Sequence, residues 1–388
     1  MELKKIHISD IGKVVTGKTP RTSVAENYGG DIPFLTPSDN LSHKSAPRTT
    51  KTLTEKGLNE VRNCLLPPRS ICVSCIGSDL GKVVMTIEPT VTNQQFNSII
   101  PNKNFNADFV YYLMTLVGRE LNYLSKTSTA VPIINKSSFS NYEVEVPDLE
   151  TQEKIASILS SLDSKIELNR RINDNLEQQA RLLFDNLIDA SDWSTTQFLS
   201  ELSEINPPRK LSKGEYAPFV EMSNMPTSGS FPSRIDYKEY NGGMKFRNGD
   251  TIMARITPCL ENGKAAYVNF LKENEIGFGS TEYIVLAPKK TISSSFLYFL
   301  VRNKEFVDYA VKHMNGSSGR QRVSGDSIGN YQLPILDRNK LSIFIAIADR
   351  TLSKIRQNSF EILNLAKQRD TLLPKLMSGE LKINDLNC

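Results

Sequence analysis

Apolar residues recur at alternating spacings of four and three along residues 155–187, which is the pattern of a helix that pairs with another helix. The positions on this seam are Ile155, Leu159, Leu162, Ile166, Asn169, Asn173, Leu176, Ala180, Leu183 and Leu187. A second seam runs through Phe344, Ala348, Thr351, Ile355, Asn358, Ile362, Leu365, Arg369, Leu372 and Leu376. The pattern predicts one long helix within residues 148–190 and another within residues 337–388, the latter followed by a C-terminal tail.

The two predicted helices are copies of each other at an offset of 189 residues. Tyr142–Asp148 aligns with Tyr331–Asp337, and the register then continues without a gap to Leu187 and Leu376. Asp148 is a suitable N-cap for the first helix, and Gly379 a suitable residue to end the second. Since an internal repeat determines the architecture, we expect a globular segment before each helix.

Each copy of the helix carries an asparagine at the same seam position, Asn169 in the first and Asn358 in the second. A buried asparagine on a helix seam costs stability and specifies the register of the pair. The first helix carries a net charge of −4 and the second one of +3, so the two attract each other. We therefore expect the helices to pair with each other. The alternative is that each helix packs only on its own globular domain.

The segments before the helices, residues 1–147 and 191–336, have mixed α/β patterns. Short apolar runs predict strands at residues 32–35, 70–74, 83–87, 96–100, 218–220, 250–254, 264–268 and 283–286. Helical periodicity predicts one helix over Ala107–Leu124 and one over Ser294–Val311. We expect an α+β protein in which two globular mixed α/β domains are separated by two long antiparallel coiled-coil helices, with a pseudo-twofold internal repeat.

Composition narrows the functional classes. The chain has 388 residues, a net charge of +4 and no apolar run near the roughly 20 residues of a membrane span. We therefore expect a cytoplasmic protein whose mildly basic character is compatible with nucleic acid. Cys72 and Cys75 have a zinc-like spacing, but their flanks are typical of a buried strand and no second pair follows. We expect no metal site.

Gly12–Thr19 matches the phosphate-loop pattern letter for letter. Such a loop needs a strand before it and a helix directly after it, so that backbone N–H groups meet phosphate. Pro20 follows instead, and no helical pattern precedes Pro33. We interpret this stretch as a turn between strands.

Two other stretches imitate enzyme motifs. Asn206-Pro-Pro-Arg209 is similar to the Asn-Pro-Pro-aromatic motif of amino-methyltransferases, but Arg209 is not aromatic. Asp163-Ser-Lys165 imitates a nuclease core but lies on the helix seam, and the repeat has Leu352 in place of the aspartate. We expect no catalytic residue in this chain.

Polar and basic residues gather in predicted loops, where binding residues are commonly found. Asn and Gln side chains bind adenine edges, Arg binds guanine, and Lys contacts phosphate. The candidate DNA-binding residues are Lys18, Arg21, Ser78, Lys82, Asn93, Gln94, Gln95, Arg255, Thr257, Lys264, Arg320 and Arg322.

Several stretches together give the chain a family resemblance. These are Gly17–Pro20, Thr92–Phe96, Glu153–Ile166, Asp250–Lys264, Gly279–Glu282 and Arg369–Leu381. The chain resembles the specificity subunit of type I restriction–modification enzymes along essentially its whole length. One departure is Asn339-Lys340, which replaces the acidic-plus-Gln start seen at Glu150–Glu153.

The resemblance implies two target-recognition domains, each reading half of a split sequence in double-stranded DNA, with the helix pair setting the unread gap. It implies two modification (methyltransferase) subunits docked on this chain, with S-adenosylmethionine on those subunits. Restriction (motor–nuclease) subunits would add ATP and magnesium, so this chain itself would hold no cofactor. The alternatives are a self-contained DNA methyltransferase or nuclease, and a coiled-coil scaffold that binds only protein.

Overall fold

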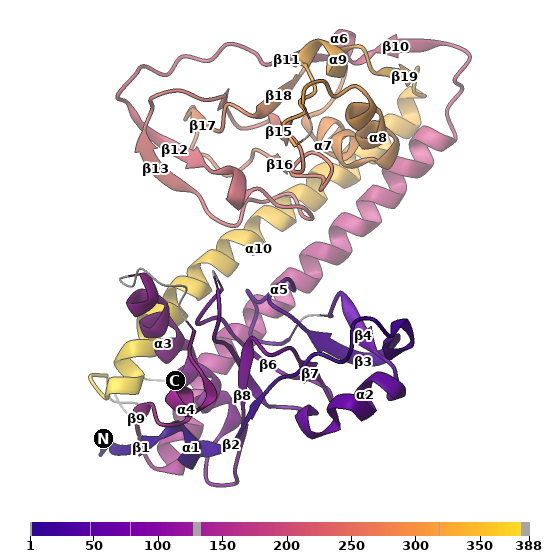
Figure 1. Ribbon diagram of the computed structural model, residues 1–388. Helices are drawn as coiled ribbons and strands as arrows, with labels where there is room; N and C mark the ends of the chain where they lie inside the picture. Colours follow the sequence, from indigo (N-terminus) through magenta and orange to yellow (C-terminus); the bar gives the residue numbers. More distant parts are fainter. Residues whose placement is uncertain (1, 47, 78, 127–132, 318, 382–388) are drawn as a thin grey trace. The chain divides into compact units, whose positions relative to one another are not determined.

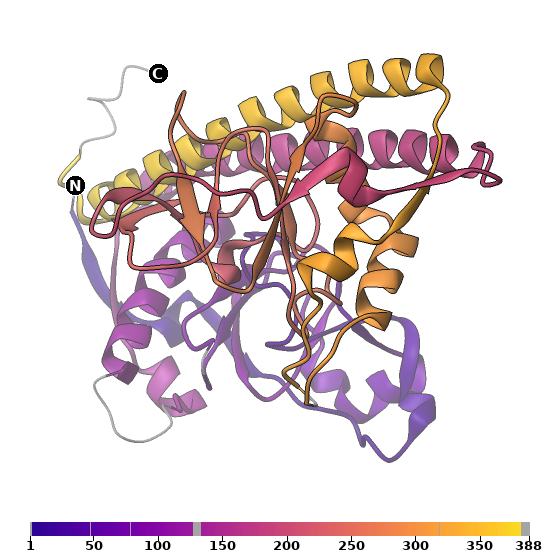
Figure 2. The same cartoon turned by 90° about the horizontal axis from the view of Figure 1, so that it is seen from above.

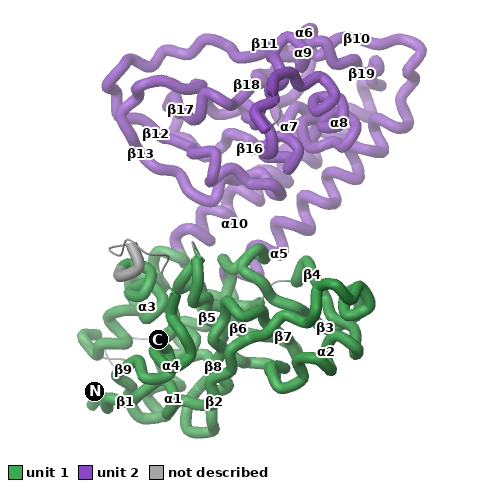
Figure 3. The backbone as a smooth tube through the Cα atoms, in the orientation of Figure 1, with its two compact units in different colours: residues 1–165, 365–388 green, residues 166–364 purple. Residues whose placement is uncertain are grey.

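The computed structural model describes residues 2–46, 48–77, 79–126, 133–317 and 319–381. The chain divides into two compact units (Figure 3), with residues 1–165 and 365–388 in unit 1 and residues 166–364 in unit 2. Two helices of 41 residues each, α5 (Leu149–Asp189) and α10 (Arg338–Ser378), contribute residues to both units.

Unit 1 is a mixed α/β unit (Figure 1). Its strands are β1 (Lys4–His7), β2 (Gly12–Thr16), β3 (Tyr28–Leu35), β4 (Lys51–Leu53), β5 (Ile71–Ser74), β6 (Val83–Met85), β7 (Val91–Thr92), β8 (Phe96–Pro101) and β9 (Glu143–Val146). Its other helices are α1 (Ile8–Ile11), η1 (Ala25–Asn27), α2 (Glu55–Val61), η2 (Arg62–Cys64), α3 (Ala107–Lys126) and α4 (Lys136–Ser140).

The strands of unit 1 form a four-stranded antiparallel sheet in the order β2-β8-β5-β6, a three-stranded sheet β4-β3-β7 and a separate pair β1-β9. In the three-stranded sheet β3 runs antiparallel to β4 and parallel to β7. Helix α3 packs on β5 and β6. Its apolar face joins the strands, the start of α5 and the end of α10 in one core, which includes Ile71, Phe109, Leu159 and Leu376.

Unit 2 also mixes strands and helices. The strands are β10 (Thr196–Phe198), β11 (Ser203–Ile205), β12 (Tyr216–Val220), β13 (Asp236–Glu239), β14 (Lys245–Phe246), β15 (Thr251–Ala254), β16 (Ala265–Tyr267), β17 (Gly277–Gly279), β18 (Tyr283–Pro288) and β19 (Gln332–Pro334). The helices are α6 (Leu199–Leu202), η3 (Met222–Asn224), α7 (Ser294–Arg302), α8 (Lys304–Lys312) and α9 (Gly325–Gly329).

The sheets of unit 2 repeat those of unit 1. The orders β11-β18-β15-β16, β13-β12-β17-β14 and β10-β19 correspond to β2-β8-β5-β6, β4-β3-β7 and β1-β9, with β14 as an added strand. Even the parallel pair recurs, because β12 runs antiparallel to β13 and parallel to β17. The predicted repeat of the globular segments is therefore present in the topology, although the sequences of these segments diverge.

The prediction of one helix over Ser294–Val311 is wrong. Asn303 adopts an extended conformation, with φ −69° and ψ 138°, and separates α7 from α8. Its side-chain oxygen accepts hydrogen bonds from the backbone N–H groups of Glu305 and Phe306. An asparagine that caps a new helix in this way ends the preceding one, although the apolar periodicity continues across the break.

Segments of α5 and α10 lie side by side and run antiparallel (Figures 1 and 2). In unit 2, Asn358 Nδ2 donates to Asn173 Oδ1 at 2.8 Å, and Asn169 Nδ2 donates to Glu361 Oε2 at 2.9 Å. In unit 1, Arg369 Nη1 donates to Asp163 Oδ1 at 2.7 Å. The expected pairing of the two helices is therefore present within each unit.

The predicted helix ends are confirmed. Asp148 Oδ1 accepts a hydrogen bond from Thr151 N–H at 2.8 Å, and Gly379 has φ 75° directly after α10. At the start of α10, where the sequence departs from the first copy, Asp337 Oδ1 accepts from Lys340 N–H at 2.9 Å. The same capping contact therefore starts both helices.

The heptad pattern places one residue of the first seam incorrectly. Leu183 is 40% exposed, and its neighbour Phe184 is fully buried instead. A straight α-helix drifts by about 20° per heptad relative to a 3.5-residue repeat, so a strict heptad loses the buried face after several turns. The phenyl ring of Phe184 packs between Phe296 of α7 and Phe344 of α10, with centroids 5.0 and 5.5 Å away.

We predict that Phe184→Ala lowers the free energy of unfolding of unit 2 by about 3–5 kcal/mol, because it leaves a cavity between the rings of Phe296 and Phe344. Leu182→Ala, on the same helix turn, removes a side chain that is 64% exposed and is expected to change stability by less than about 0.5 kcal/mol. Denaturant titrations of both variants measure the difference. Equal effects would show that α5 does not pack on unit 2 through Phe184.

Candidate nucleic-acid interface

The candidate binding loops occupy equivalent places in the two units. In unit 1 the N–H of Cys75, directly after β5, donates to the carbonyl oxygen of Gln95 at 2.8 Å. In unit 2 the N–H of Arg255, directly after β15, donates to the carbonyl oxygen of Glu282 at 3.0 Å. The two sheets therefore hold Gln95 and Glu282 at the same backbone position, at the ends of equivalent strands.

The local turns before these two residues also match. Asn93 Oδ1 accepts a hydrogen bond from Gln95 N–H at 3.1 Å, and Ser280 Oγ accepts one from Glu282 N–H at 3.1 Å. A short polar side chain that bonds the N–H two residues later makes the same kind of turn in both loops. The loops over residues 93–95 and 280–282 are thus two versions of one element.

Unit 1 brings Lys18 together with this loop. The N–H of Lys18 donates to the carbonyl oxygen of Thr92 at 2.9 Å, and Thr19 Oγ1 donates to Gln94 Oε1 at 2.6 Å. Gly17 allows this approach, because a Cβ at that position would lie 2.2 Å from the carbonyl oxygen of Asn93. Lys18 and Gln94 are exposed, Gln95 is partly exposed, and Asn93 is buried beneath them.

Other predicted residues of unit 1 are already paired with carboxylates. Arg21 Nη2 lies 2.8 Å from Glu60 Oε1, and hydrogen bonds from Arg21 lower the pKa of Glu60 to about 2. Lys82 Nζ lies 2.5 Å from Asp79 Oδ1. Ser78 lies outside the described residues. Because Arg21 and Lys82 are paired elsewhere, the cluster of predicted binding residues in unit 1 consists of Lys18 and residues 93–95.

Unit 2 gathers a stronger charged cluster around Glu282. Arg322 Nε donates to Glu282 Oε1 and Oε2 at 3.0 and 2.9 Å, and Arg322 Nη2 donates to Oε1 at 2.7 Å. The side-chain hydrogen bonds from Arg322, supported by the positive charge of Arg255, hold the pKa of Glu282 below its ordinary value. Glu282 belongs to the polar stretch Gly279–Glu282 of the sequence but was not among the predicted DNA-binding residues. The matching spacing of Ser280–Glu282 and Asn93–Gln95 in the sequence is the signal that identifies it.

The backbone of the 320–323 segment is fixed to the loop after β15. Thr257 N–H donates to the carbonyl oxygen of Gln321 at 3.1 Å, and Val323 N–H donates to that of Arg255 at 3.0 Å. Arg322 Nη1 donates to the carbonyl oxygen of Arg320, whose own side chain is exposed. Arg255, Thr257, Arg320 and Arg322 therefore form one surface together with Glu282.

Lys264 has a different environment from these residues. Its Nζ donates to the carbonyl oxygen of Met222 at 2.8 Å, and the residue is only partly exposed. This contact connects the residue before β16 to η3. In the conformation described, Lys264 supports the fold of the loop.

The phosphate-loop match is a strand followed by a turn. Residues Gly12–Thr16 form β2, and their backbone groups pair with β8. In the part of the chain that the structure describes, the next helix is the single turn η1, which begins only at Ala25. Backbone N–H groups engaged in a sheet do not cradle a phosphate.

The Asn-Pro-Pro motif is structural. Asn206 N–H donates to the carbonyl oxygen of Val285 at 2.7 Å, and Asn206 Oδ1 accepts from Val285 N–H at 2.9 Å. Asn206 has φ 52°, a left-handed conformation that asparagine tolerates. Its side chain thereby continues the pairing of β11 with β18, and Arg209 Nη2 forms a buried ion pair with Asp250 at 2.7 Å.

The residues of the nuclease-like motif (Asp163) and of the zinc-like motif (Cys72 and Cys75) also have structural roles. Asp163 accepts hydrogen bonds from Tyr112 Oη at 2.5 Å and from Arg369. Cys72 and Cys75 are buried, and burial raises the pKa of the Cys72 thiol to about 12. Among the residues that the structure describes, no group of His, Cys, Asp and Glu side chains is arranged to hold a metal ion.

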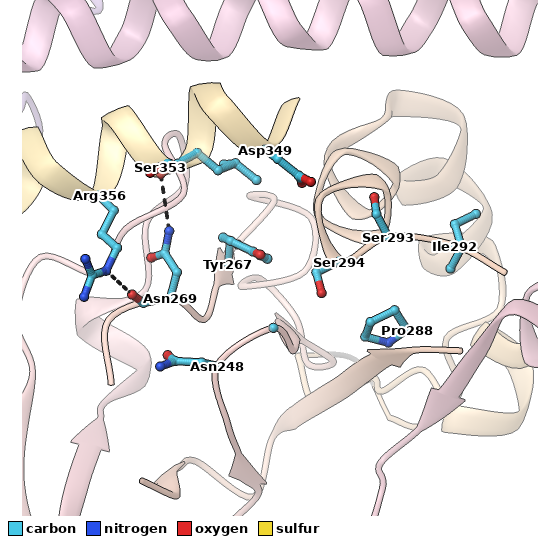
Figure 4. Close-up of a pocket in the computed structure, with 12 residues that line it drawn as sticks. Asn248, Tyr267, Asn269, Pro288, Ile292, Ser293, Ser294, Asp349, Ser353 and Arg356 are labelled. Carbon is cyan, nitrogen blue, oxygen red and sulfur yellow. Dashed lines mark hydrogen bonds between the residues drawn. The ribbon is translucent and has the colours of Figure 1, made fainter. Parts of the chain in front are cut away.

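A pocket of about 570 Å³ lies in unit 2 beside α10 (Figure 4). Asp349 and Arg356 of α10 line it on one side, and Tyr267 and Ser294 line it on the other. Arg356 Nε donates to the carbonyl oxygen of Asn269. None of the predicted DNA-binding residues lines this pocket.

Of the helices in the described ranges, none is long and apolar enough to cross a membrane.

The family profile and two of the related proteins that match this chain belong to type I restriction systems. The profile of the type I restriction modification DNA specificity domain matches residues 1–178 and 191–340. A protein named type I restriction enzyme MjaIX specificity subunit, from Methanocaldococcus jannaschii, is 29% identical over 99% of this chain and 94% of its own length. The HindI specificity subunit of Haemophilus influenzae is 37% identical over 43% of this chain and 38% of its own length.

The fold also matches a solved structure. The S subunit of a type I restriction–modification system from M. genitalium aligns with a TM-score of 0.57 and 16% identity. The alignment covers 97% of this chain and 96% of that protein. The two proteins therefore share the fold over nearly their whole lengths.

We predict that Arg322→Met raises the pKa of Glu282 toward its ordinary value of about 4.3, because it removes the hydrogen bonds that favour the carboxylate. Since the folded-state pKa is depressed, the pair stabilises the fold above the ordinary pKa, and this contribution disappears as the pH falls through the depressed value. Carboxyl NMR titration, assigned with Glu282→Gln, measures the shift.

The matched control for this titration is Arg320→Met, because Arg320 bonds to Arg322 through its backbone carbonyl oxygen, which the substitution keeps. This variant is expected to leave the pKa of Glu282 in place. A pKa of Glu282 that is the same in the wild type and in Arg322→Met would contradict the described ion pair.

Proposed function

The chain belongs to the family of type I restriction modification DNA specificity domains, and from this membership we propose how it selects a DNA sequence. It is a DNA-sequence specificity subunit with two target-recognition domains, and catalysis belongs to other subunits. We assign residues 1–147 and 191–336 to the two recognition domains, and residues 148–190 and 337–388 to the spacer helices with the C-terminal tail. Each domain reads one half of a bipartite site in double-stranded DNA.

One observation supports this proposal most strongly. The two units share one sheet topology, but equivalent loops of the two units carry different polar side chains. In unit 1 the loop presents lysine and amide groups, and in unit 2 it presents arginines around a carboxylate. Basic groups contact phosphates, whereas amides, guanidinium groups and carboxylates discriminate base edges. Two copies of one scaffold with different surfaces therefore suit two different half-sites.

We assign the DNA contacts residue by residue. In unit 1 these are Lys18, Arg21, Ser78, Lys82, Asn93, Gln94 and Gln95. In unit 2 they are Arg255, Thr257, Lys264, Arg320 and Arg322. Lys18 is suited to a phosphate contact, and the exposed amides and the arginines are suited to base edges. The buried Asn93 acts by orienting Gln95. Arg21 and Lys82 are paired with Glu60 and Asp79 in the conformation described.

The helix pair acts as the spacer between the half-sites. Each helix has 41 residues, which corresponds to ~60 Å at ~1.5 Å per residue. The polar contacts of Asn169 and Asn358 with the opposite helix permit one register, because a slip leaves buried amides without partners. A fixed register gives a fixed number of unread base pairs.

The partners follow from the same proposal. Specificity subunits of type I systems assemble with methyltransferase and restriction subunits and bind DNA. Two modification subunits dock on this chain and bring S-adenosylmethionine, and restriction subunits bring ATP and magnesium. The chain acts on cellular DNA in the cytoplasm.

The function is tested by mapping methylated adenines in cells that contain the modification subunit, with and without the gene for this chain. We predict that a bipartite motif disappears with the gene. Replacing residues 1–147 with those of another specificity subunit is predicted to change only one half of the motif. If neither change alters methylation, this chain is not the reader.

The spacer role predicts the effect of lengthening the helices. Inserting four residues after Lys165 in α5 and after Asn364 in α10 adds ~6 Å to each helix. We expect the gap in the methylated motif to widen by about two base pairs at ~3.4 Å each, with both half-sites unchanged. A four-residue insertion after the exposed Asn241, in the loop before β14, is the control and should leave the gap unchanged. An unchanged gap after the helix insertions would rule out the spacer role.

A further inference from the structure

The equivalent positions Gln95 and Glu282 differ in hydrogen-bond character. Both are fixed by the same backbone contacts, so their side chains leave equivalent points of the two sheets. One ends in an amide, which offers an acceptor and a donor, and the other ends in a carboxylate, which only accepts. The two units therefore present different hydrogen-bond patterns at the same place.

In unit 2 the pattern consists of a carboxylate beside a guanidinium. Of the five N–H donors of Arg322, two are used by Glu282 and one by the carbonyl oxygen of Arg320. The remaining two have no acceptor among the described residues. Glu282 Oε2 receives only the shared Nε–H contact and can accept another hydrogen bond. The side chains of Arg322 and Glu282 are 37% and 26% exposed, so both are accessible to a ligand.

This pattern of two donors beside one acceptor matches one kind of base pair. In the major groove a G·C pair presents the acceptors N7 and O6 of guanine next to the N4 amino donor of cytosine. An A·T pair presents a donor between two acceptors, followed by the methyl group of thymine. A carboxylate facing an acceptor or a methyl group would lose hydrogen bonds that it has in water.

In unit 1 the hydrogen-bonding groups at the equivalent position are those of the Gln95 amide. Gln95 Oε1 accepts from Asn93 Nδ2 at 2.8 Å and keeps a second lone pair, while Gln95 Nε2 has no acceptor among the described residues. An acceptor and a donor on one amide match N6 and N7 of adenine. Asn93 is buried and fixes the orientation of the amide.

We infer that Glu282 together with Arg322 reads a G·C base pair in the half-site of unit 2, and that Gln95 reads an A·T pair at the equivalent place in the half-site of unit 1. The inference rests on the proposed function and adds the base pair that each position selects. Glu282 accepts from cytosine N4, Arg322 donates to guanine N7 and O6, and Asn93 is a positioning residue for Gln95.

The test measures affinities of the assembly with its modification subunits for duplexes in which each base pair of the site is replaced in turn. We expect wild type to lose about tenfold or more in affinity when the G·C pair read by unit 2 is replaced. Glu282→Gln and Arg322→Met should each remove the preference at that one position and leave the other half-site unchanged. Gln95→Glu should remove the preference at one A·T position in the half-site of unit 1.

Thr281→Ala, at the exposed neighbour of Glu282, is the matched control and should leave every preference in place. Retained discrimination in the opposite half-site shows that each variant is folded and assembled. The inference is overturned if the affected position in the half-site of unit 2 is an A·T pair. It is also overturned if the loss is spread evenly over all positions.

The outcomes separate the two proposals. A wild-type assembly without sequence preference contradicts the proposed function itself. A wild type that discriminates in both half-sites, combined with variants that change other positions or none, contradicts only the assignment of Glu282, Arg322 and Gln95.

Discussion

The structure depends on the burial of the apolar faces of α5 and α10. In unit 1, Leu159 and Leu376 from the two helices enter the same core as the sheet and α3. In unit 2, Phe184 and Phe344 do the same with α7. A helix of 41 residues with an apolar seam is stable in water only when that seam is covered, so each unit completes its core with segments of both helices. We propose that the buried Asn169 and Asn358, which bond to the opposite helix, restrict the pair to one register.

The paired helices leave the recognition surfaces free to differ. Backbone hydrogen bonds such as those of Cys75 to Gln95 and of Arg255 to Glu282 hold the loops in place. Because these bonds do not involve side chains, an amide in one unit and a carboxylate in the other fit the same scaffold. Stability therefore comes from the sheets and helices, and base discrimination is assigned to side chains at the loop surface.

The parts of this architecture that local patterns encode were predictable from the sequence. Helix caps at Asp148 and Gly379 and the helix seams depend on residues a few positions apart. The break at Asn303 was missed because apolar periodicity continues across it. The ion pair of Glu282 with Arg322 was missed because it joins residues 40 positions apart, and only the folded sheet brings them together. The role of Asn206 as a strand partner was missed for the same reason.

We propose that two independent readers are joined by one spacer. A missing-base interference map of the assembly on its own DNA site tests this arrangement most directly. Removing bases one at a time should weaken binding in two separated patches, with an insensitive gap between them. Arg322→Met should reduce the sensitivity of one patch only, and Gln95→Glu that of the other only. A single continuous patch, or both patches changing together in either variant, would contradict the presence of two independent readers.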